Sequence, residues 1–545
     1  MPGLIPLALI AAPWWETAVL TAYLGSVLGL SVFGLHRLSL LYLYWRHRDR
    51  AVPLPEPVAD AECPHVLVQL PIYNERFVVE RLLDSVAALD WPADRLHVQL
   101  LDDSTDDTVE VSTRAVRRHR AAGLDIELLH RVDRSGFKAG ALQEGLQAEA
   151  TSPFVVVFDA DFVPPADFLR RIVPPLLDDE GVGMVQARWG HLNRDDSLLT
   201  RAQAILLDGH FIMESGARFR GGRFFNFNGT AGIWRRQAIV DAGGWQGDTL
   251  TEDLDLSYRA QLEGWRFVYL QSLEVPAELP TDPRAFKSQQ HRWAKGSIQC
   301  AFKLLPRIWR APLPLAQKLE ASFHMGNNLA YPLMVVLLLV LPLAIGLRQD
   351  SPLWIGLAVD LPVFVFATLN LMAFYALAER EVDRSTWAWK LPLVPFVLGL
   401  GASLTPNQAR AVWQALRGHR SPFVRTPKAG DGGNTTRYRP RIGAQVLVEI
   451  AGCLYYTGAA LLAASAGLWL SMPFLLLFAA GFGVLGFGSL LPDARPVRAG
   501  SGAGTRAPTL QPAPRTRPMA PTPAPARVPR PVASSTPGTK AAGGR

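Results

Sequence analysis

Residues 154–161, FVVVFDAD, join a wholly apolar run to two carboxylates one residue apart. Two earlier apolar runs, 65–70 HVLVQL and 97–101 HVQLL, alternate with helical patterns over 76–89 and 107–121. This alternation predicts an α/β domain built on a parallel sheet with crossover helices. Ligands bind such sheets beyond the carboxyl ends of the strands, so acidic residues directly after a strand mark the expected site.

Two acidic motifs follow these strands. Asp159 and Asp161 come at the end of the 154–158 strand, and their hard oxygen atoms could approach one cation whose other positions hold phosphate oxygens. Asp102 and Asp103 follow the 97–101 strand. Because Asp and Ser also form turns and cap helices, this second pair is as consistent with a turn as with a ligand site.

Two further motifs lie near the end of the α/β region. Glu252 and Asp253 open the helical pattern 254–263, where the helix dipole favours acids, although a carboxylate there could also act as a general base. Gln289, Arg292 and Trp293 form a Q-x-x-R-W sequence. Arginine suits a diphosphate and tryptophan offers a flat apolar face, whereas a tryptophan near a membrane is also a common interface anchor.

Apolar segments flank the α/β region. Residues 17–35 are long enough to cross roughly 30 Å of hydrocarbon and lack a cleavage pattern, which predicts a retained transmembrane helix. Arg46, Arg48 and Arg50 follow it, so the positive-inside rule predicts that the next domain is cytosolic. Residues 296–320 mix basic with large apolar residues, as amphipathic helices at a membrane interface do.

The second half of the chain contains more apolar segments. We expect spans near 328–347, 353–377, 444–469 and 472–491. Residues 391–404 form a helix of only roughly 21 Å, too short to cross, so we expect an interfacial or re-entrant segment there. The predicted domains are a transmembrane helix in 1–44, a cytosolic domain in 45–295, interfacial helices in 296–327, a transmembrane channel region in 328–491 with a cytosolic loop at 406–443, and a disordered tail in 492–545.

Composition excludes several classes of protein. The 55 Lys and Arg against 48 Asp and Glu give a formal charge of +7, but the excess lies beside apolar segments and in the tail. This distribution indicates contact with an anionic leaflet rather than with nucleic acid. Cys63, Cys300 and Cys453 are too far apart in sequence for a zinc motif or a disulfide framework.

Together these motifs carry a family resemblance over roughly residues 65 to 430. D, DxD, TED and QxxRW, in this order and followed by membrane helices, resemble the processive family-2 glycosyltransferases, which include cellulose, hyaluronan and chitin synthases. Within that group the chain most resembles the cellulose-synthase-like mannan and glucan synthases. The segments that carry this second resemblance are QLPIYNE (69–75), LDDSTD (101–106), GFKAGAL (136–142), FNGTAGIWRR (227–236), TEDLDLSYRA (251–260), QQHRWAKG (289–296) and SPFVRTPK (421–428).

The resemblance implies a GT-A fold and a role for each motif. Asp102 and Asp103 would hold the nucleoside, helped by Tyr73 and Glu75. Lys138 would contact the diphosphate. Asp159 and Asp161 would bind the sugar nucleotide and Mg²⁺ or Mn²⁺, with Asp161 as the direct metal ligand.

Further roles are implied at the other motifs. Asp253 would be the catalytic base, next to Glu252 among the substrate-binding residues. Gln289 and Arg292 would bind the diphosphate, and Trp293 would stack under the non-reducing end of the growing chain. Phe423, Thr426 and Lys428 are similar to the F-x-V-T-x-K gating loop of cellulose synthases, although Arg425 replaces its valine.

The function implied is a membrane-bound, inverting transfer of hexose from UDP-glucose or GDP-mannose to a β-linked, β-1,4 polysaccharide, with export of the product. The alternative is a single transfer to a lipid acceptor, such as polyprenyl phosphate or diacylglycerol. A transporter or receptor with a nucleotide-sensing domain would explain the spans but not Asp253 and Trp293. The expected partners are the nucleotide sugar, the growing polysaccharide and the lipid bilayer of the inner or plasma membrane, without nucleic acid.

Overall fold

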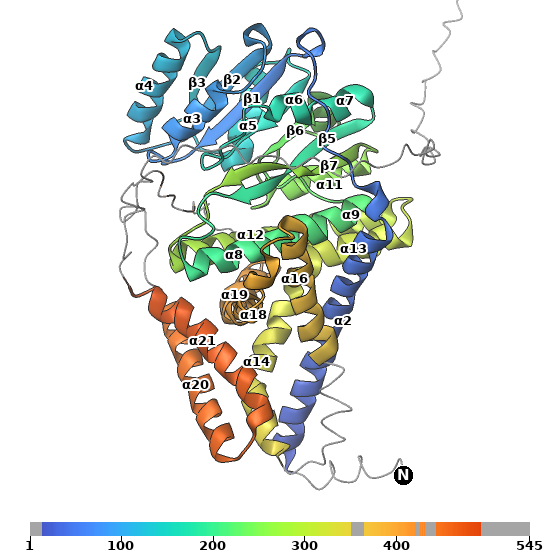
Figure 1. Ribbon diagram of the computed structural model, residues 1–545, viewed down its shortest axis with the longest axis vertical. Helices are drawn as coiled ribbons and strands as arrows, with labels where there is room; N and C mark the ends of the chain where they lie inside the picture. Colours follow the sequence, from blue (N-terminus) through green and yellow to red (C-terminus); the bar gives the residue numbers. More distant parts are fainter. Residues whose placement is uncertain are drawn as a thin grey trace, which may run out of the picture. The chain divides into compact units, whose positions relative to one another are not determined.

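The computed structural model describes residues 13–349, 364–419, 426, 428, 430 and 443–491. Its α/β region is built on a seven-stranded sheet in the order β3-β2-β1-β4-β6-β5-β7 (Figure 1). The strands are β1 (Val66–Ile72), β2 (Leu96–Asp102), β3 (Ile126–His130), β4 (Phe154–Val157), β5 (Val182–His191), β6 (Gly232–Arg235) and β7 (Arg266–Ala277). The predicted α/β class and the three predicted strands are confirmed.

The three predicted strands pair in parallel, as expected, but the sheet as a whole is mixed. Strands β1 to β4 pair in parallel, as do β5 and β7, but β6 runs antiparallel to both β4 and β5. β6 is only four residues long and fully apolar at Gly232–Trp234. A short apolar run carries no signal of strand direction, because direction depends on the connections on either side.

Both faces of the sheet are covered, which is why the central strand β4 is apolar throughout. Alternate residues of β4 belong to different cores: Phe154 and Val156 to one, Val155 and Val157 to the other. The first core contains residues of α3 (Val79–Ala87), α4 (Thr108–Ala121), α6 (Phe168–Ile172) and α7 (Pro174–Asp178). The second contains residues of α5 (Phe137–Ala148), α10 (Arg236–Asp241) and α11 (Glu252–Leu262).

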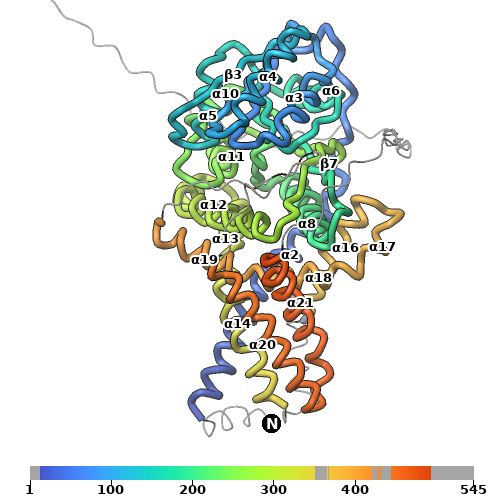
Figure 2. The backbone as a smooth tube through the Cα atoms, turned by 90° about the vertical axis from the view of Figure 1, so that its left-hand side faces the viewer, coloured from blue at the N-terminus to red at the C-terminus, as the bar shows by residue number. Residues whose placement is uncertain are grey.

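Four helices among the described residues are long and apolar enough to cross a membrane by length and composition. They are α2 (Trp14–Arg46), the continuous segment Leu315–Leu347 made of α13 (Leu315–Gly326) and α14 (Ala330–Leu347), α20 (Gln445–Ser465), and Trp469–Gly488, which contains α21 (Met472–Gly488). α14 lies beside α2, and α20 beside α21 (Figure 2). These helices coincide with four of the five predicted spans.

The remaining apolar segments are shorter. α18 (Leu393–Ser403) is an apolar helix of 11 residues, as expected for the 391–404 segment. Residues 353–363 of the predicted 353–377 span lie outside the described residues. The rest of the span lies in the π-helix η6 (Phe364–Leu369) and in α16 (Asn370–Val382).

The predicted loop 406–443 is wrong at its start. α19 (Thr405–Leu416) is a helix there, because Val412 and Ala415 form an apolar face that packs on Ile298. Beyond residue 419, the structure describes only residues 426, 428, 430 and 443 of the predicted loop. Phe423 lies outside the described residues. The predicted tail 492–545 also lies outside it.

One long helix continues from the α/β region toward the apolar helices. α12 (Pro283–Arg310) begins at an Asp282 cap, whose carboxylate accepts a hydrogen bond from the Arg284 N–H, with Pro283 in the first turn. The domain boundary predicted between residues 295 and 296 therefore falls inside a helix. Gln289, Arg292 and Trp293 lie in the first half of this helix rather than before it.

A buried ion pair joins α12 to the C-terminal helix pair. The Lys287 Nζ donates to both oxygens of Glu449 on α20, at 2.8 and 2.7 Å, and to the Ser489 Oγ at 3.0 Å. Both charged side chains are almost fully buried. Removing one partner leaves an uncompensated charge, which costs more than removing both.

We therefore expect Glu449→Ala to destabilise the protein by about 3–5 kcal/mol and Lys287→Met with Glu449→Leu to cost less. Thermal unfolding of the detergent-purified protein measures both. Glu110→Ala, which removes the exposed Glu110–Arg114 pair, is the control and should change stability by about 1 kcal/mol or less. Equal stability of the Glu449→Ala and unsubstituted proteins would contradict the role given to the pair.

Candidate active site

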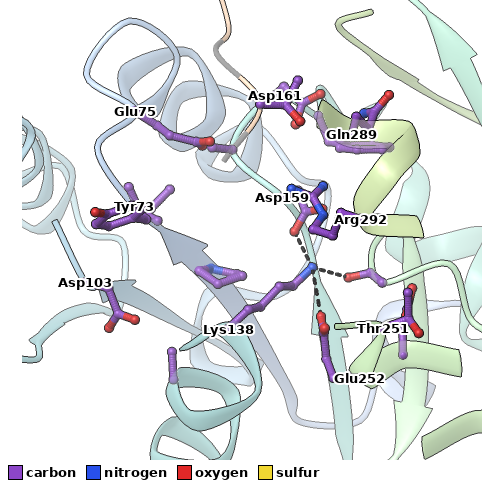
Figure 3. Close-up of a pocket in the computed structure, with 18 of the residues that line it drawn as sticks. Tyr73, Glu75, Asp103, Lys138, Asp159, Asp161, Thr251, Glu252, Gln289 and Arg292 are labelled. Carbon is purple, nitrogen blue, oxygen red and sulfur yellow. Dashed lines mark hydrogen bonds and ion pairs between the residues drawn. The ribbon is translucent and has the colours of Figure 1, made fainter. Parts of the chain in front are cut away.

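A cleft lies where the carboxyl ends of β1, β2 and β4 meet the start of α11 and the first half of α12 (Figure 3). The empty space of this cleft is about 1080 Å³, including the part that is open to solvent. The predicted site residues that line it are Tyr73, Glu75, Asp103, Lys138, Asp159, Asp161, Glu252, Asp253, Gln289, Arg292, Trp293, Thr426 and Lys428. Residues up to 355 positions apart in sequence therefore share one cavity.

Lys138, on α5, is the central cation of the cleft. Its Nζ lies 2.5 Å from the Asp159 Oδ1, 2.9 Å from the Gly229 carbonyl oxygen and 3.9 Å from the Glu252 Oε1 (Figure 3). Burial lowers the pKa of Lys138, but the carboxylates of Asp159 and Glu252 outweigh burial, so its pKa is raised. The ammonium is therefore charged and lies between Asp159, after β4, and Glu252, at the start of α11.

Asp253 is the carboxylate with the most perturbed acidity in this cleft. Burial, followed by the negative charge of Glu252, raises the pKa of Asp253 to about 7. Its Oδ1 accepts a hydrogen bond from the Leu254 N–H at 2.8 Å, which fixes the side chain at the start of α11. A carboxyl group with a pKa near neutrality can both accept and release a proton at physiological pH.

Gly229 forms the wall between these groups. Its φ of +82° is in the left-handed region, and a Cβ there would lie 3.0 Å from the Asp253 Oδ2 and 3.4 Å from the Lys138 Nζ. Glycine at this position adopts the left-handed backbone conformation without strain. It also leaves room for the two charged side chains.

The two carboxylates after β4 are each paired with a lysine. Asp159 pairs with Lys138, and the Asp161 Oδ2 accepts a hydrogen bond from the Lys428 Nζ at 2.5 Å. Lys428 also donates to the Glu278 carbonyl oxygen at 3.0 Å. Asp159 is further fixed by its N–H, which donates to the Thr230 Oγ1 at 2.9 Å.

Asp159 and Asp161 could bind a divalent cation only if a diphosphate supplies further oxygen ligands. Within the described part of the chain, no group of three or more His, Cys, Asp or Glu side chains could hold a metal ion. Mg²⁺ is commonly bound by one or two carboxylates, with phosphate oxygens and water in its other positions. The hard oxygens of Asp159 and Asp161 meet that requirement if a diphosphate is present.

The two acids after β2 have different surroundings. The Asp103 carboxylate receives two hydrogen bonds of 2.7 Å from Arg131 and lines the cleft. Asp102 is fully buried, does not line the cleft, and accepts the Ser104 N–H at 2.8 Å. Of the two interpretations given for this pair, a turn and a ligand site, Asp102 fits the turn. A direct nucleoside contact stays a prediction that the geometry supports for Asp103 alone.

Sequence reasoning missed three residues of the site. Arg134 lies over the Tyr73 ring, 3.3 Å from its centroid, and Arg131 orients Asp103. Both arginines follow β3, where the sequence alone gives no sign that they turn inward. Trp189, on β5, lies with its ring centroid 6.5 Å from that of Trp293. Its only sequence signal is a large aromatic residue at the end of an apolar strand.

The α/β region is similar to known proteins. The family model described as Glycosyltransferase like family 2 matches residues 64–296. Glucomannan 4-beta-mannosyltransferase 2 of Arabidopsis thaliana is 45% identical over 280 residues, which cover 50% of this chain and 52% of that protein. Glucomannan 4-beta-mannosyltransferase 1 of Oryza sativa subsp. japonica is 44% identical over 269 residues, covering 49% and 52%. The chain thus spans about half the length of the curated relatives it matches.

Among solved structures, the chain is similar to a mannosyltransferase from Pyrobaculum calidifontis in complex with GDP-Man and Mn²⁺. That similarity has a TM-score of 0.46 and 23% identity, and covers 65% of this chain and 99% of the other. The family match over residues 64–296, together with the mixed sheet order, confirms the expected GT-A class of fold.

Proposed function

We propose that the glycosyltransferase family-2 domain formed by residues 64–296 makes this protein a membrane-bound, inverting hexosyltransferase. Its donor is a nucleotide sugar and its product a β-1,4-linked polysaccharide. The observation that carries the proposal is the convergence of Lys138, Asp253, Arg292 and Trp293 on one cleft. The relatives' names support mannose, and therefore GDP-mannose over UDP-glucose, as the preferred donor.

The chain's cations bind and orient the donor diphosphate. Lys138 and Arg292 present an ammonium and a guanidinium toward the cleft, and Gln289 adds an amide. Mg²⁺ or Mn²⁺, held by Asp161 and Asp159 with phosphate oxygens, would neutralise part of the charge of the departing nucleoside diphosphate. Tyr73 and Asp103, at the ends of β1 and β2, lie where the nucleoside would sit.

The chemical step is a single displacement. The Asp253 carboxylate takes a proton from an acceptor hydroxyl, and that oxygen forms the new bond to the anomeric carbon. The bond from this carbon to the phosphate oxygen breaks, and its electron pair stays on the leaving diphosphate. Attack from the face opposite the leaving group converts an α-linked donor into a β-linked product.

The acceptor sugar would stack on Trp293, whose indole lines the cleft on α12. Thr426 and Lys428 also line the cleft, as expected of a loop that contacts the substrates. The four apolar helices would span the membrane, with the arginines after α2 on the cytosolic side together with the catalytic domain. The growing chain would leave between them.

The function is tested by incubating the protein, in detergent or in vesicles, with a panel of labelled nucleotide sugars. We expect label from GDP-mannose to enter a polymer that an endo-β-1,4-mannanase degrades. Label confined to a single-sugar glycolipid would favour transfer to a lipid acceptor. No transfer from any donor would refute the enzyme assignment.

Asp253→Asn should lower the rate of transfer by about 10²–10⁴-fold or more, because an amide cannot accept the proton. Binding of GDP, measured by calorimetry, should persist. Asp248→Asn is a matched control, since Asp248 pairs with Lys303 on an exposed surface. Turnover of the Asp253→Asn protein near that of the unsubstituted protein would rule out the base assignment.

The raised pKa of Asp253 predicts a dependence on pH. The base works only when deprotonated, so kcat/KM should rise with pH through a midpoint near the Asp253 pKa of about 7 and then level off. Glu252→Gln removes a neighbouring negative charge that raises the pKa of Asp253, so the midpoint should move to lower pH. A midpoint that stays in place would show that another group controls the acid limb.

A further inference from the structure

Arg131 is a buried arginine behind the wall of the cleft. It directly follows β3, and its backbone N–H donates to the Asp102 carbonyl oxygen at 3.0 Å, which continues the pairing of β2 with β3. Its side chain is only 7% exposed and does not line the cleft, whereas its partner Asp103 does. A buried guanidinium needs acceptors for its N–H groups, and these acceptors indicate what it holds in place.

The guanidinium binds both oxygens of the Asp103 carboxylate. The Arg131 Nε donates to the Asp103 Oδ1 and the Arg131 Nη2 donates to the Asp103 Oδ2, each at 2.7 Å. Two parallel hydrogen bonds fix the plane of the carboxylate, which a lysine ammonium cannot do. Each carboxylate oxygen keeps a second lone pair. Because Asp103 lines the cleft, an N–H donor of a ligand bound there would complete its hydrogen bonds.

The Arg131 side chain is itself fixed by α5. Its Nη2 donates to the Phe137 carbonyl oxygen at 2.9 Å, and its Nη1 donates to the Glu144 Oε1 at 2.9 Å. A Cβ at Gly140 of the same helix would lie 2.8 Å from the Arg131 Nη1, so a glycine there leaves room for the guanidinium. Arg131 is therefore held from one side by a helix and holds Asp103 on the other.

The diphosphate end of the cleft is fixed by other contacts. Lys138 follows Phe137 in sequence, but its ammonium is held by the Asp159 Oδ1 at 2.5 Å and the Gly229 carbonyl oxygen at 2.9 Å (Figure 3). These bonds are separate from those that Arg131 makes. A change at Arg131 should therefore disturb Asp103 and leave the Lys138 ammonium in place.

The chemistry of Asp103 favours particular bases. A carboxylate paired with an arginine accepts hydrogen bonds and donates none. Guanine and uracil carry a hydrogen on the ring nitrogen in the middle of their base-pairing edge, whereas adenine and cytosine present a lone pair there. A site built to bind an N–H group rejects an analogue that lacks it, because the acceptor is then left without its donor. A fixed carboxylate thus attracts the first two bases and repels the other two.

We infer that Arg131 is a positioning residue for the nucleoside end of the donor site. It holds the Asp103 carboxylate in a fixed plane, so that Asp103 accepts a hydrogen bond from the ring N–H of guanine or uracil. Arg131 contacts neither the base nor the diphosphate and acts through Asp103. The inference rests on the proposed function for the class of donor. It adds the residue that makes the acid after β2 selective among bases.

The test measures binding of GDP, ADP and inorganic diphosphate, each with Mn²⁺, to the purified full-length protein by calorimetry. We expect GDP to bind more tightly than ADP, a purine nucleotide of the same size with the opposite edge. Arg131→Lys keeps the charge but cannot fix the carboxylate plane, so it should weaken GDP binding about tenfold. Binding of ADP and of inorganic diphosphate should change by less than about twofold, because Lys138 keeps its own anchors.

Arg170→Lys is the matched control. Arg170 is 8% exposed, and its Nε and Nη2 donate to the two oxygens of Asp90 at 3.2 and 3.0 Å. Its Nη1 donates to the Val58 carbonyl oxygen at 2.8 Å. Burial, aspartate fork and carbonyl acceptor thus match those of Arg131, but neither Arg170 nor Asp90 lines the cleft. This variant should bind all three ligands as the unsubstituted protein does.

A double-variant cycle separates positioning from a general structural role. Asp103→Asn keeps the size of the side chain but loses the charge, and should weaken GDP binding about tenfold. Adding Arg131→Lys to Asp103→Asn should weaken it by less than about twofold more, because Arg131 acts through the carboxylate that is already gone. Thermal unfolding shows whether each variant is folded. If Arg131→Lys is not, Asp103→Asn decides: a loss confined to GDP supports the inference, and equal losses for the three ligands overturn it.

Three further results would overturn the role of Arg131. They are equal losses for GDP, ADP and diphosphate in Arg131→Lys, an unchanged GDP affinity in Asp103→Asn, and fully additive losses in the double variant. Any of these in a protein that still transfers sugar from a nucleotide donor would leave the proposed function standing. The expected binding pattern in a protein that transfers no sugar would support the role of Arg131 and refute the proposed function.

Discussion

The site depends on ion pairs between buried acidic and basic side chains. Isolated charges are costly to bury, so each acid in the cleft wall needs a cation from another part of the chain. Lys138 of α5 meets Asp159 after β4 and Glu252 at the start of α11, and Lys428 meets Asp161. These pairs fix the sheet edge, two helices and a distant segment relative to one another. The geometry of the site therefore follows from the same contacts that make it foldable.

Polar contacts also join the cleft to the apolar helices. The His210 Nε2 lies 3.0 Å from the Asn228 Oδ1 in the cleft wall, and its Nδ1 lies 3.2 Å from Glu214. Glu214 accepts a hydrogen bond from Arg37 of α2 at 3.1 Å. With the Lys287–Glu449 pair of α12 and α20, the wall is tied to helices from both ends of the chain. These helices therefore help to hold the side chains of the cleft wall in place.

The sequence was most informative where chemistry and strand pattern coincide. The FVVVFDAD stretch predicts both a buried strand and acids at its end, and the structure brings Asp161, Asp253 and Trp293 to one cavity. The predicted nucleoside contact of Asp102 is not supported. Adjacent residues at a strand end point to opposite sides, so Asp102 and Asp103 could not both face the cleft. The antiparallel β6 and the inward arginines depend on tertiary pairing, which local pattern does not encode.

The balance of charge in the cleft gives an independent reason to expect a divalent cation. Of the described lining residues, six are acids (Glu75, Asp103, Asp159, Asp161, Glu252 and Asp253) and four are bases (Arg134, Lys138, Arg292 and Lys428). A nucleoside diphosphate adds further negative charge to a wall that already has an excess, so a cation must enter with it. Because Asp161 is already paired with Lys428, a metal ion that uses this carboxylate must share or replace that ion pair. Under the proposed function, binding of donor and metal would therefore be coupled to the Lys428–Asp161 ion pair.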